Sequence, residues 1–302
     1  ALEVASRIAN QAGAMLMTEF GTARTERGAG RVSVPRIPYV VDEALRVTRP
    51  YKHIILVGAK VPVAFFAYPD QPSVLIPETC EPHILARAEE DVLHALLWLS
   101  DELGATNTEP TLQTPERPDL RSGALDPDAI GAAIGHLLPE NAIVSDESLT
   151  AGRGVAPFTV GCPPHDWLYG TGGSIGRGLP EATGAAVACP NRKVLSLSGD
   201  GSAMYTVQAL WTQARENLDV TTVIFANRSY AILHDELQNV GAQPGPNTQA
   251  MFNLDQPHLD WVSLANGMGV EAARAETAEQ FNQVLEAGLS SKGPYLIEAV
   301  LG

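Results

Sequence analysis

Two oxygen-bearing side chains, Asp200 and Asn227, each follow an apolar segment of the sequence. The segments are 194–197 and 221–225, and a helix-like pattern separates them. If they form neighbouring parallel strands, both side chains lie at the carboxyl edge of a sheet, where such sheets bind ligands. Carboxylate and amide oxygens are hard ligands that suit Mg²⁺, and the backbone carbonyl of Ser229 would add a third oxygen. The spacing therefore predicts a magnesium site.

The residues around this carboxylate also suit a bound diphosphate. Gly199 and Gly201 allow the backbone to come close to phosphate oxygens. We expect a helix over 202–218, whose first turn at Ser202 and Ala203 would point free N–H groups and a positive dipole end at the ligand. A metal ion beside a helix N-terminus predicts a site for a metal-bound diphosphate.

Strand-like and helix-like segments alternate along the chain, which is typical of parallel sheets covered by helices. The expected strands are 14–18, 53–58, 73–77, 142–145, 194–197, 221–225 and 295–300. The expected helices are 1–9, 41–47, 89–103, one opening at the capping residue Asp126, 179–189, 202–218 and 276–289. We predict an α/β fold with two doubly wound parallel-sheet domains, over 1–104 and 126–302. A polar, proline-rich linker over 105–125 would join them.

The chain opens within an amphipathic pattern, with apolar residues at Leu2, Ala5, Ile8 and Ala9. No methionine starts the sequence, and two interpretations are about equally favoured. The chain begins inside a domain, whose remainder lies upstream or on another polypeptide, or it begins with an ordinary N-terminal helix. Under the first interpretation the domain over 1–104 is incomplete at its N-terminus.

The overall composition excludes several classes of protein. The net charge is −15 with only 20 lysines and arginines among 302 residues, so no nucleic-acid partner is expected. No apolar run is long enough to cross a bilayer, so no membrane span is expected. The three cysteines, Cys80, Cys162 and Cys189, are too few and too scattered for a disulfide framework or a zinc site. Reduced cysteines favour a cytoplasmic location.

The motif Gly199-Asp200-Gly201, followed by a helix, a strand and Asn227, resembles the signature of thiamine-diphosphate-dependent enzymes. The sequence is similar to benzoylformate decarboxylase and to acetolactate synthase large subunits, and the segments 169–180 and 291–298 extend the similarity. The resemblance implies thiamine diphosphate and Mg²⁺ as cofactors. It also implies a central flavodoxin-like domain over 1–104 and a diphosphate-binding domain over 126–302.

Further site residues follow from this resemblance alone. Ile175 would lie under the cofactor and enforce its bent shape, and the carbonyl of Gly173 would face the aminopyrimidine. Ile232 and Glu236 fall where relatives line the substrate pocket. The residues implied to hold the cofactor are Glu147, Ser148, Leu149, Thr150, Gly173, Ile175, Gly199, Gly201, Ser202, Ala203 and Tyr230.

The family's activating Glu lies in an N-terminal pyrimidine-binding domain outside this chain, so a missing upstream segment or a second chain would supply it. In relatives it comes from the neighbouring subunit, which implies a homodimer or homotetramer. The run 59–66 replaces the arginine-containing segment of flavin-binding relatives, so FAD is not expected. Phe65 stands near the position of a catalytic-site His in benzoylformate decarboxylase.

The resemblance implies decarboxylation of a small 2-keto acid, with or without carboligation to a second carbonyl compound. Two alternatives remain, an acetolactate-synthase-type carboligase and a non-catalytic, cofactor-binding relative that lacks the activating Glu. By residue type alone, Glu147 is equally well explained as a helix-capping acid. Residue type favours surface or structural positions over catalytic roles for His165, His234 and His258, and a buried position for Trp211.

Overall fold

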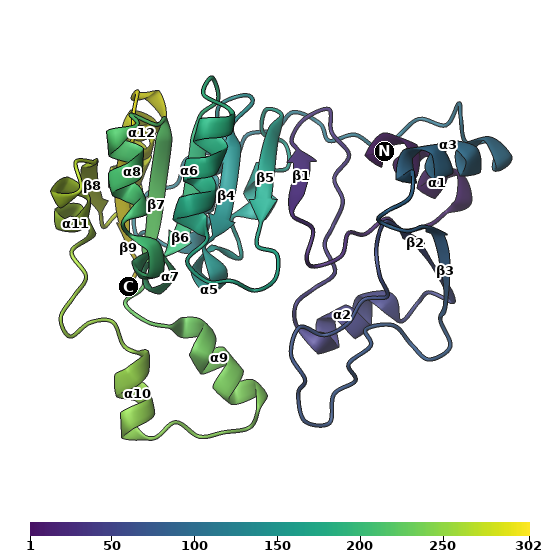
Figure 1. Ribbon diagram of the computed structural model, residues 1–302, viewed down its shortest axis with the longest axis horizontal. Helices are drawn as coiled ribbons and strands as arrows, with labels where there is room; N and C mark the ends of the chain where they lie inside the picture. The colour runs from purple at the N-terminus through teal and green to yellow at the C-terminus, as the bar shows by residue number, and fades with distance from the viewer. The chain divides into compact units, whose positions relative to one another are not determined.

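The computed structural model describes residues 1–302, and the chain forms two compact units. Unit 1 comprises Ala1–Thr22 and Arg31–Leu112, and unit 2 comprises Ala23–Gly30 and Gln113–Gly302. Residues 23–30, which we expected in the first domain, thus belong to unit 2. Figure 1 labels the helices and strands of both units.

Unit 2 is built on a seven-stranded sheet with the order β1-β5-β4-β6-β7-β9-β8 (Figure 1). All neighbouring pairs are parallel except β1 and β5. Its strands are β1 Arg24–Arg27, β4 Ile143–Glu147, β5 His165–Tyr169, β6 Val194–Gly199, β7 Val220–Ala226, β8 Glu271–Ala275 and β9 Tyr295–Val300. The mostly parallel sheet with covering helices confirms the predicted α/β class.

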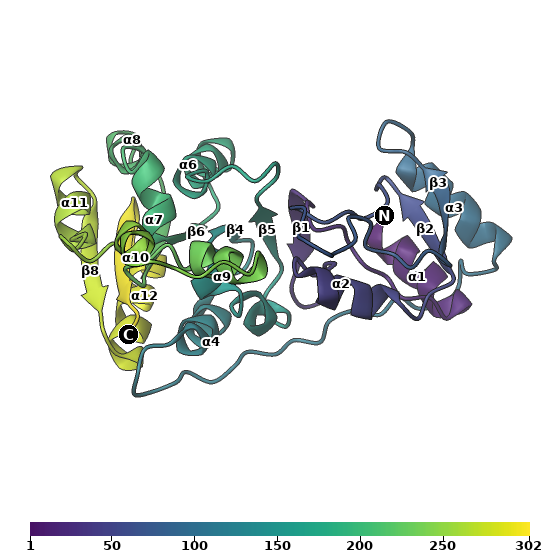
Figure 2. The same cartoon turned by 90° about the horizontal axis from the view of Figure 1, so that it is seen from below.

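Helices cover both faces of this sheet, as the view in Figure 2 shows. One face carries α6, α8 and α11, and the other carries α4 and α12. The helices of the unit are α4 Pro127–Leu137, α5 Leu149–Gly152, α6 Gly178–Ala188, α7 Asp200–Ala203, α8 Ala209–Arg215, α9 Ala231–Asn239, α10 Pro246–Phe252, α11 Trp261–Gly267 and α12 Ala278–Ser290. Two short 3₁₀ segments are Ala156–Thr159 and Met204–Thr206. Every residue of β7 is buried, because a central strand covered on both faces has no solvent side.

The antiparallel edge strand β1 is fixed to β5 by charged side chains. Arg24 Nε donates to Asp166 Oδ1 at 2.7 Å, and Arg192 Nη2 donates to Asp166 Oδ2 at 2.6 Å. The Arg27 guanidinium lies 4.8 Å from the ring centre of Trp167. The polar sequence of β1 did not suggest a strand, because these partners lie about 140 residues away.

Unit 1 contains a two-stranded parallel sheet of β2 His53–Val57 and β3 Glu81–Ala86. Its helices are α1 Leu2–Ala12, α2 Val41–Thr48 and α3 Val92–Glu102. The helices α1 and α3 pack together around Ile8, Leu96 and Ala105.

The prediction of two further strands in unit 1 was wrong. The stretches 14–18 and 73–77 form only isolated bridges, Thr18 with Arg36 and Val63 with Val74. Prolines at positions 72 and 77 flank the second stretch and restrict its backbone and hydrogen bonding.

The prediction of a single helix over 202–218 was also wrong. The chain instead forms α7, a 3₁₀ turn and α8. The β-branched pair Thr206 and Val207 disfavours a continuous helix, and Thr206 Oγ1 donates to the carbonyl of Gly176 at 2.6 Å. Trp211 on α8 is 53% exposed rather than buried, with the Arg215 guanidinium 4.9 Å from its ring centre.

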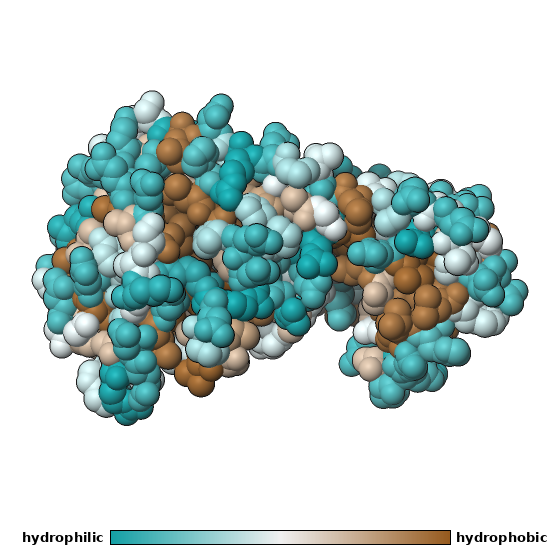
Figure 3. All heavy atoms as spheres, turned by 90° about the horizontal axis from the view of Figure 1, so that it is seen from above, coloured by the Kyte–Doolittle hydropathy of each residue, from teal (hydrophilic) through white to brown (hydrophobic).

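Large apolar side chains reach the surface in both units, among them Trp98 on α3 and Trp211 on α8. Figure 3 shows brown, apolar areas between hydrophilic ones on the face that it presents. None of the helices combines the length and the apolar composition that crossing a bilayer requires.

Candidate functional site

The carboxyl ends of β4, β6 and β7 lie side by side and carry most of the predicted site residues (Figure 1). The register pairs Glu147 with Ser198 and Gly199 with Phe225. Asp200 therefore follows the end of β6 beside the end of β7, and Asn227 follows β7 directly. The structure thus brings the two side chains of the predicted metal site to one edge of the sheet, as their spacing indicated.

Asp200 is only 3% exposed, and both of its carboxylate oxygens accept backbone N–H groups. Oδ1 accepts from Gly201 N at 2.8 Å, and Oδ2 accepts from Arg228 N at 2.7 Å. Burial raises the pKa of the Asp200 carboxyl, and these N–H groups oppose the shift. A buried carboxylate whose hydrogen bonds all come from backbone N–H groups has a strong electrostatic preference for a nearby cation. The residue therefore fits a divalent metal ligand.

The loop after β7 has an unusual backbone that presents Asn227 and Ser229 at this edge. Asn227 Oδ1 accepts the Ser229 N–H at 3.1 Å, and Arg228 between them has φ 57°, which is rare for a residue with a side chain. Such strained positions cluster at functional sites. Sequence analysis missed Arg228, since neither its type nor its spacing indicates a left-handed backbone.

A distant segment fixes this loop from the other side. Arg228 O accepts Leu254 N at 2.8 Å, and Tyr230 N donates to Phe252 O at 2.8 Å. The Tyr230 ring lies directly over Gly201, so that a Cβ at Gly201 would overlap it and would also approach Leu254 Cδ1 to 3.2 Å. Gly201 is thus required by packing in this structure. A Cβ at Gly199, by contrast, would meet only Ser202 Oγ at 3.8 Å.

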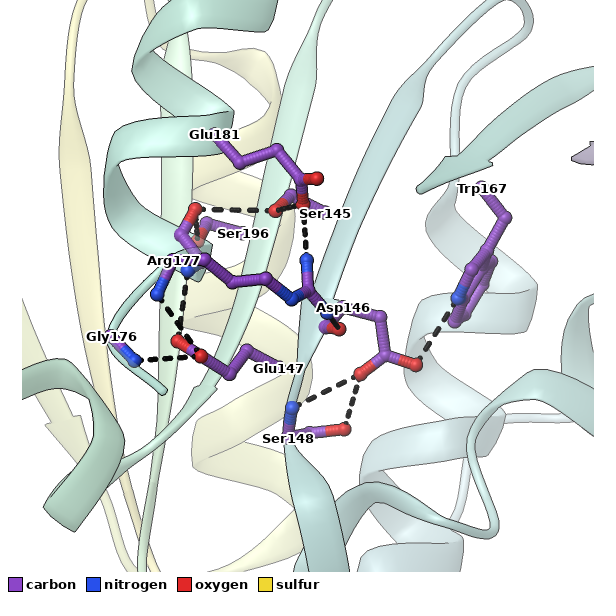
Figure 4. A network of polar contacts seen from close by, with 10 residues as sticks. Ser145, Asp146, Glu147, Ser148, Trp167, Gly176, Arg177, Glu181 and Ser196 are labelled. Atoms are coloured by element: carbon purple, nitrogen blue, oxygen red, sulfur yellow. Dashed lines mark hydrogen bonds and ion pairs between the residues drawn. The ribbon is translucent and has the colours of Figure 1, made fainter. Parts of the chain in front are cut away.

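Glu147 at the end of β4 anchors the glycine-rich loop, residues 170–178, which leads from β5 into α6 (Figure 4). Its Oε1 accepts Gly176 N at 2.8 Å and Arg177 N at 3.1 Å, and its Oε2 accepts Gly178 N at 2.8 Å. The side chain is buried, and burial raises its pKa against the opposing effect of these N–H groups. Both oxygens are used at the start of α6, as the capping interpretation implies. Direct contact with a cofactor stays a prediction for Glu147.

Further polar contacts fix the same corner of the sheet (Figure 4). Asp146 Oδ1 accepts the hydroxyl of Ser148 at 2.5 Å, and Asp146 Oδ2 accepts Trp167 Nε1 at 3.1 Å. Arg177 donates to the carbonyl of Asp146 and, at 2.5 Å, to Glu181 Oε2. Sequence analysis missed Asp146 and Arg177, although the spacing of Arg177 and Glu181 is that of a helical ion pair.

The remaining predicted cofactor residues line the same edge. Leu149 has φ 49°, a second left-handed position without glycine, and Thr150 next to it is half-buried. Gly173 has φ 69°, and Ile175 in the same loop is 45% exposed. Ser202 and Ala203 are buried in α7, whose single turn replaces the long helix dipole that we expected.

The predicted substrate-pocket residues, Ile232 and Glu236, lie on α9 and are half-buried. The helix α9 packs against α5, which begins at Leu149. The structure therefore places them on the same side of unit 2 as the strand ends.

Strand ends that present a buried carboxylate, an amide and loops with left-handed backbone suit a metal-associated diphosphate, and in α/β domains ligands bind at this edge of the sheet. Residues 154–299 match the family model described as thiamine pyrophosphate enzyme, C-terminal TPP binding domain. This match places residues 154–299 in the thiamine-diphosphate-dependent enzyme family.

Relatives with similar sequences have names from this family. A protein of Mycobacterium tuberculosis named "Putative acetolactate synthase large subunit IlvX" is 47% identical over 99% of this chain and 58% of its own length. Benzoylformate decarboxylase of Pseudomonas aeruginosa is 30% identical over 87% of this chain and 51% of its own length. The chain thus spans somewhat more than half the length of these curated relatives.

A similar solved structure is the thiamine diphosphate-dependent 4-hydroxybenzoylformate decarboxylase of Rhodococcus jostii RHA1. It has a TM-score of 0.80 and 25% identity, with 98% of this chain and 57% of that chain covered. The benzoylformate decarboxylase structure from Polynucleobacter necessarius, with a TM-score of 0.72 and 20% identity, has the same fold.

Proposed function

We propose that this chain holds the diphosphate of thiamine diphosphate through Mg²⁺ and takes part in decarboxylating a small 2-keto acid. The observation that carries the proposal is the buried Asp200 carboxylate beside Asn227 at two adjoining strand ends. Asp200 Oδ, Asn227 Oδ1 and the carbonyl of Ser229 would bind the metal ion. Bound thiamine diphosphate supplies an electron sink for cleavage of the bond between the carboxyl group and the keto carbon.

The chain's own residues would orient this cofactor. The backbone of Ser148, Leu149 and Thr150 and the first turn of α7 would receive the diphosphate. Ile175 and the Gly173 carbonyl would contact the rings, and their exposed loop leaves both accessible. Glu147 would hold the amides of Gly176–Gly178 in place beside the cofactor. Ile232 and Glu236 on α9 would line the substrate side.

The activating Glu of the family would come from a pyrimidine-binding domain upstream or on another chain. We accordingly propose a homodimer or homotetramer in the cytoplasm, with no bound FAD. Intact mass and size-exclusion measurements on the protein purified from its source would identify such a partner. A chain of 32.1 kDa without any partner would favour a cofactor-binding relative that lacks catalytic activity.

The first test is thiamine diphosphate binding by titration calorimetry in the presence of Mg²⁺. Replacement of Asp200 by Ala should weaken binding by on the order of 100-fold or more, because a charged metal ligand is lost. Asp101→Asn is a matched control, since this exposed residue lies on α3 in unit 1. Unchanged affinity in Asp200→Ala would refute the assignment of the site.

The second candidate activity is carboligation of the acetolactate-synthase type. The 47% identity to the Mycobacterium tuberculosis relative supports it, whereas the Pseudomonas and Rhodococcus relatives support decarboxylation of an aryl 2-keto acid. Product analysis with pyruvate and with benzoylformate distinguishes the two. Acetolactate from pyruvate would establish ligation, and benzaldehyde from benzoylformate would establish decarboxylation.

A further inference from the structure

Three exposed side chains of unit 1 converge on one face of its two-stranded sheet. The parallel register of β2 and β3 pairs His53 with Glu81 and Ile55 with His83. Residues two positions apart on a strand point to the same face, so Glu81 and His83 both lie on the face that carries His53. The two imidazoles are tilted by 39° with their ring centres 5.2 Å apart.

The three nearest ligand atoms form a compact triangle. His53 Nδ1 lies 3.0 Å from His83 Nε2. Glu81 Oε2 lies 3.8 Å from His53 Nδ1 and 3.9 Å from His83 Nε2. A triangle with sides of 3.0, 3.8 and 3.9 Å has a centre about 2.1 Å from each corner, which matches typical bond lengths from zinc to imidazole nitrogen and carboxylate oxygen.

We propose that His53, Glu81 and His83 bind one divalent transition-metal ion, of which Zn²⁺ is the ion to test first. Two imidazoles and one carboxylate suit zinc, cobalt, nickel or iron, whereas Mg²⁺ prefers oxygen ligands alone. The carboxylate supplies the negative charge that two neutral imidazoles lack. Without an ion, a single proton shared between the two ring nitrogens explains their 3.0 Å separation.

The site is open to an ion from solvent. The side chains of His53, Glu81 and His83 are 63%, 68% and 46% exposed, so water can complete the coordination. A bound ion would link β2 to β3 across the residues between positions 53 and 83, and these strands form the only sheet of unit 1. Zinc binding should therefore stabilise unit 1 against unfolding, as any ligand does that binds the folded state alone.

The test is isothermal titration calorimetry, in which the whole, tag-free polypeptide is titrated with Zn²⁺ in the presence of excess Mg²⁺. Excess Mg²⁺ occupies oxygen-rich sites such as that at Asp200, so failure here is independent of the proposed cofactor site. We expect one Zn²⁺ per chain and a rise in the melting temperature. His83→Gln and Glu81→Gln should each weaken binding by at least about tenfold, since even the loss of a supporting outer contact has that effect.

His94→Gln is the matched control, because His94 is an exposed histidine on α3 outside the cluster. With Co²⁺ as the probe, the wild-type protein should show visible absorption bands that disappear in the double variant His53→Gln/His83→Gln. Circular dichroism checks that this variant is folded. The proposal is overturned if the double variant binds Zn²⁺ as tightly as the wild type, or if His94→Gln weakens binding equally.

Discussion

Replacement of Glu147 by Gln should reduce the free energy of unfolding and loosen the glycine-rich loop. The carboxylate accepts three backbone N–H groups, from Gly176, Arg177 and Gly178. A glutamine can keep the two donors at Oε1, but its NH₂ group would face the N–H of Gly178. One buried N–H without an acceptor costs about 1–3 kcal/mol, and the cheaper burial of a neutral amide offsets part of that loss.

The pH dependence gives this prediction a second, independent observable. Burial raises the pKa of Glu147 above its ordinary value of 4.5, so the folded state binds a proton more readily than the unfolded state. The contribution of Glu147 to stability therefore falls as the pH rises from about 4.5 through the raised value. Glu147→Gln does not titrate and should lack this decline.

Urea unfolding followed by circular dichroism between pH 4 and pH 8 measures both effects, with Glu140→Gln as the control at an exposed position. Hydrogen exchange would report on the amides of residues 176–178, which should exchange faster in Glu147→Gln. Equal stability and equal protection in the variant and the wild type would show that the carboxylate does not hold the loop.

Three further predictions concern unit 2. Burial lowers the pKa of His165 to about 4, so the unfolded state binds more protons between about pH 4 and 6.5 and stability rises with pH there. His165→Phe should remove up to about 3 kcal/mol of that rise in a urea series, and an unchanged slope would contradict the assignment. Asp166→Asn, which weakens the contacts of two arginines, should lower the free energy of unfolding by about 1–3 kcal/mol, whereas a wild-type value would show that β1 is held otherwise. Gly201→Ala should displace the Tyr230 ring at a cost of about 1–3 kcal/mol and weaken cofactor binding, whereas Gly199→Ala should leave the free energy of unfolding unchanged if packing at Gly201 is the cause.

Local patterns predicted the central part of unit 2 because its strands carry their own signals. The strands β6 and β7 consist mainly of apolar residues with a few serines and threonines between them, which is typical of a buried parallel strand, and the residues after them had to lie at one edge. The start of α4 at the capping residue Asp126 was also predictable from the sequence, and the Asp126 side chain accepts the N–H of Ala129 at 2.7 Å.

Features that depend on distant partners could not be predicted in this way. The polar strand β1 is held by Asp166, and β5 lies in a segment without a clear apolar pattern. The role of Glu147 depends on the amides of a loop some thirty residues further along. The left-handed backbone of Arg228 depends on the segment 252–254, whose pairing with this loop no local motif indicates.

The placement of β1 makes unit 2 discontinuous in the chain, since residues 23–30 belong to it and residues 31–112 do not. During synthesis β1 leaves the ribosome long before its partner β5. The two strands can therefore pair only after the whole intervening unit has been made. A fragment that begins at residue 113 would leave β5 as an unpaired edge, which favours aggregation. Excising the diphosphate-binding unit as a stable domain therefore requires residues 23–30 to be grafted onto it.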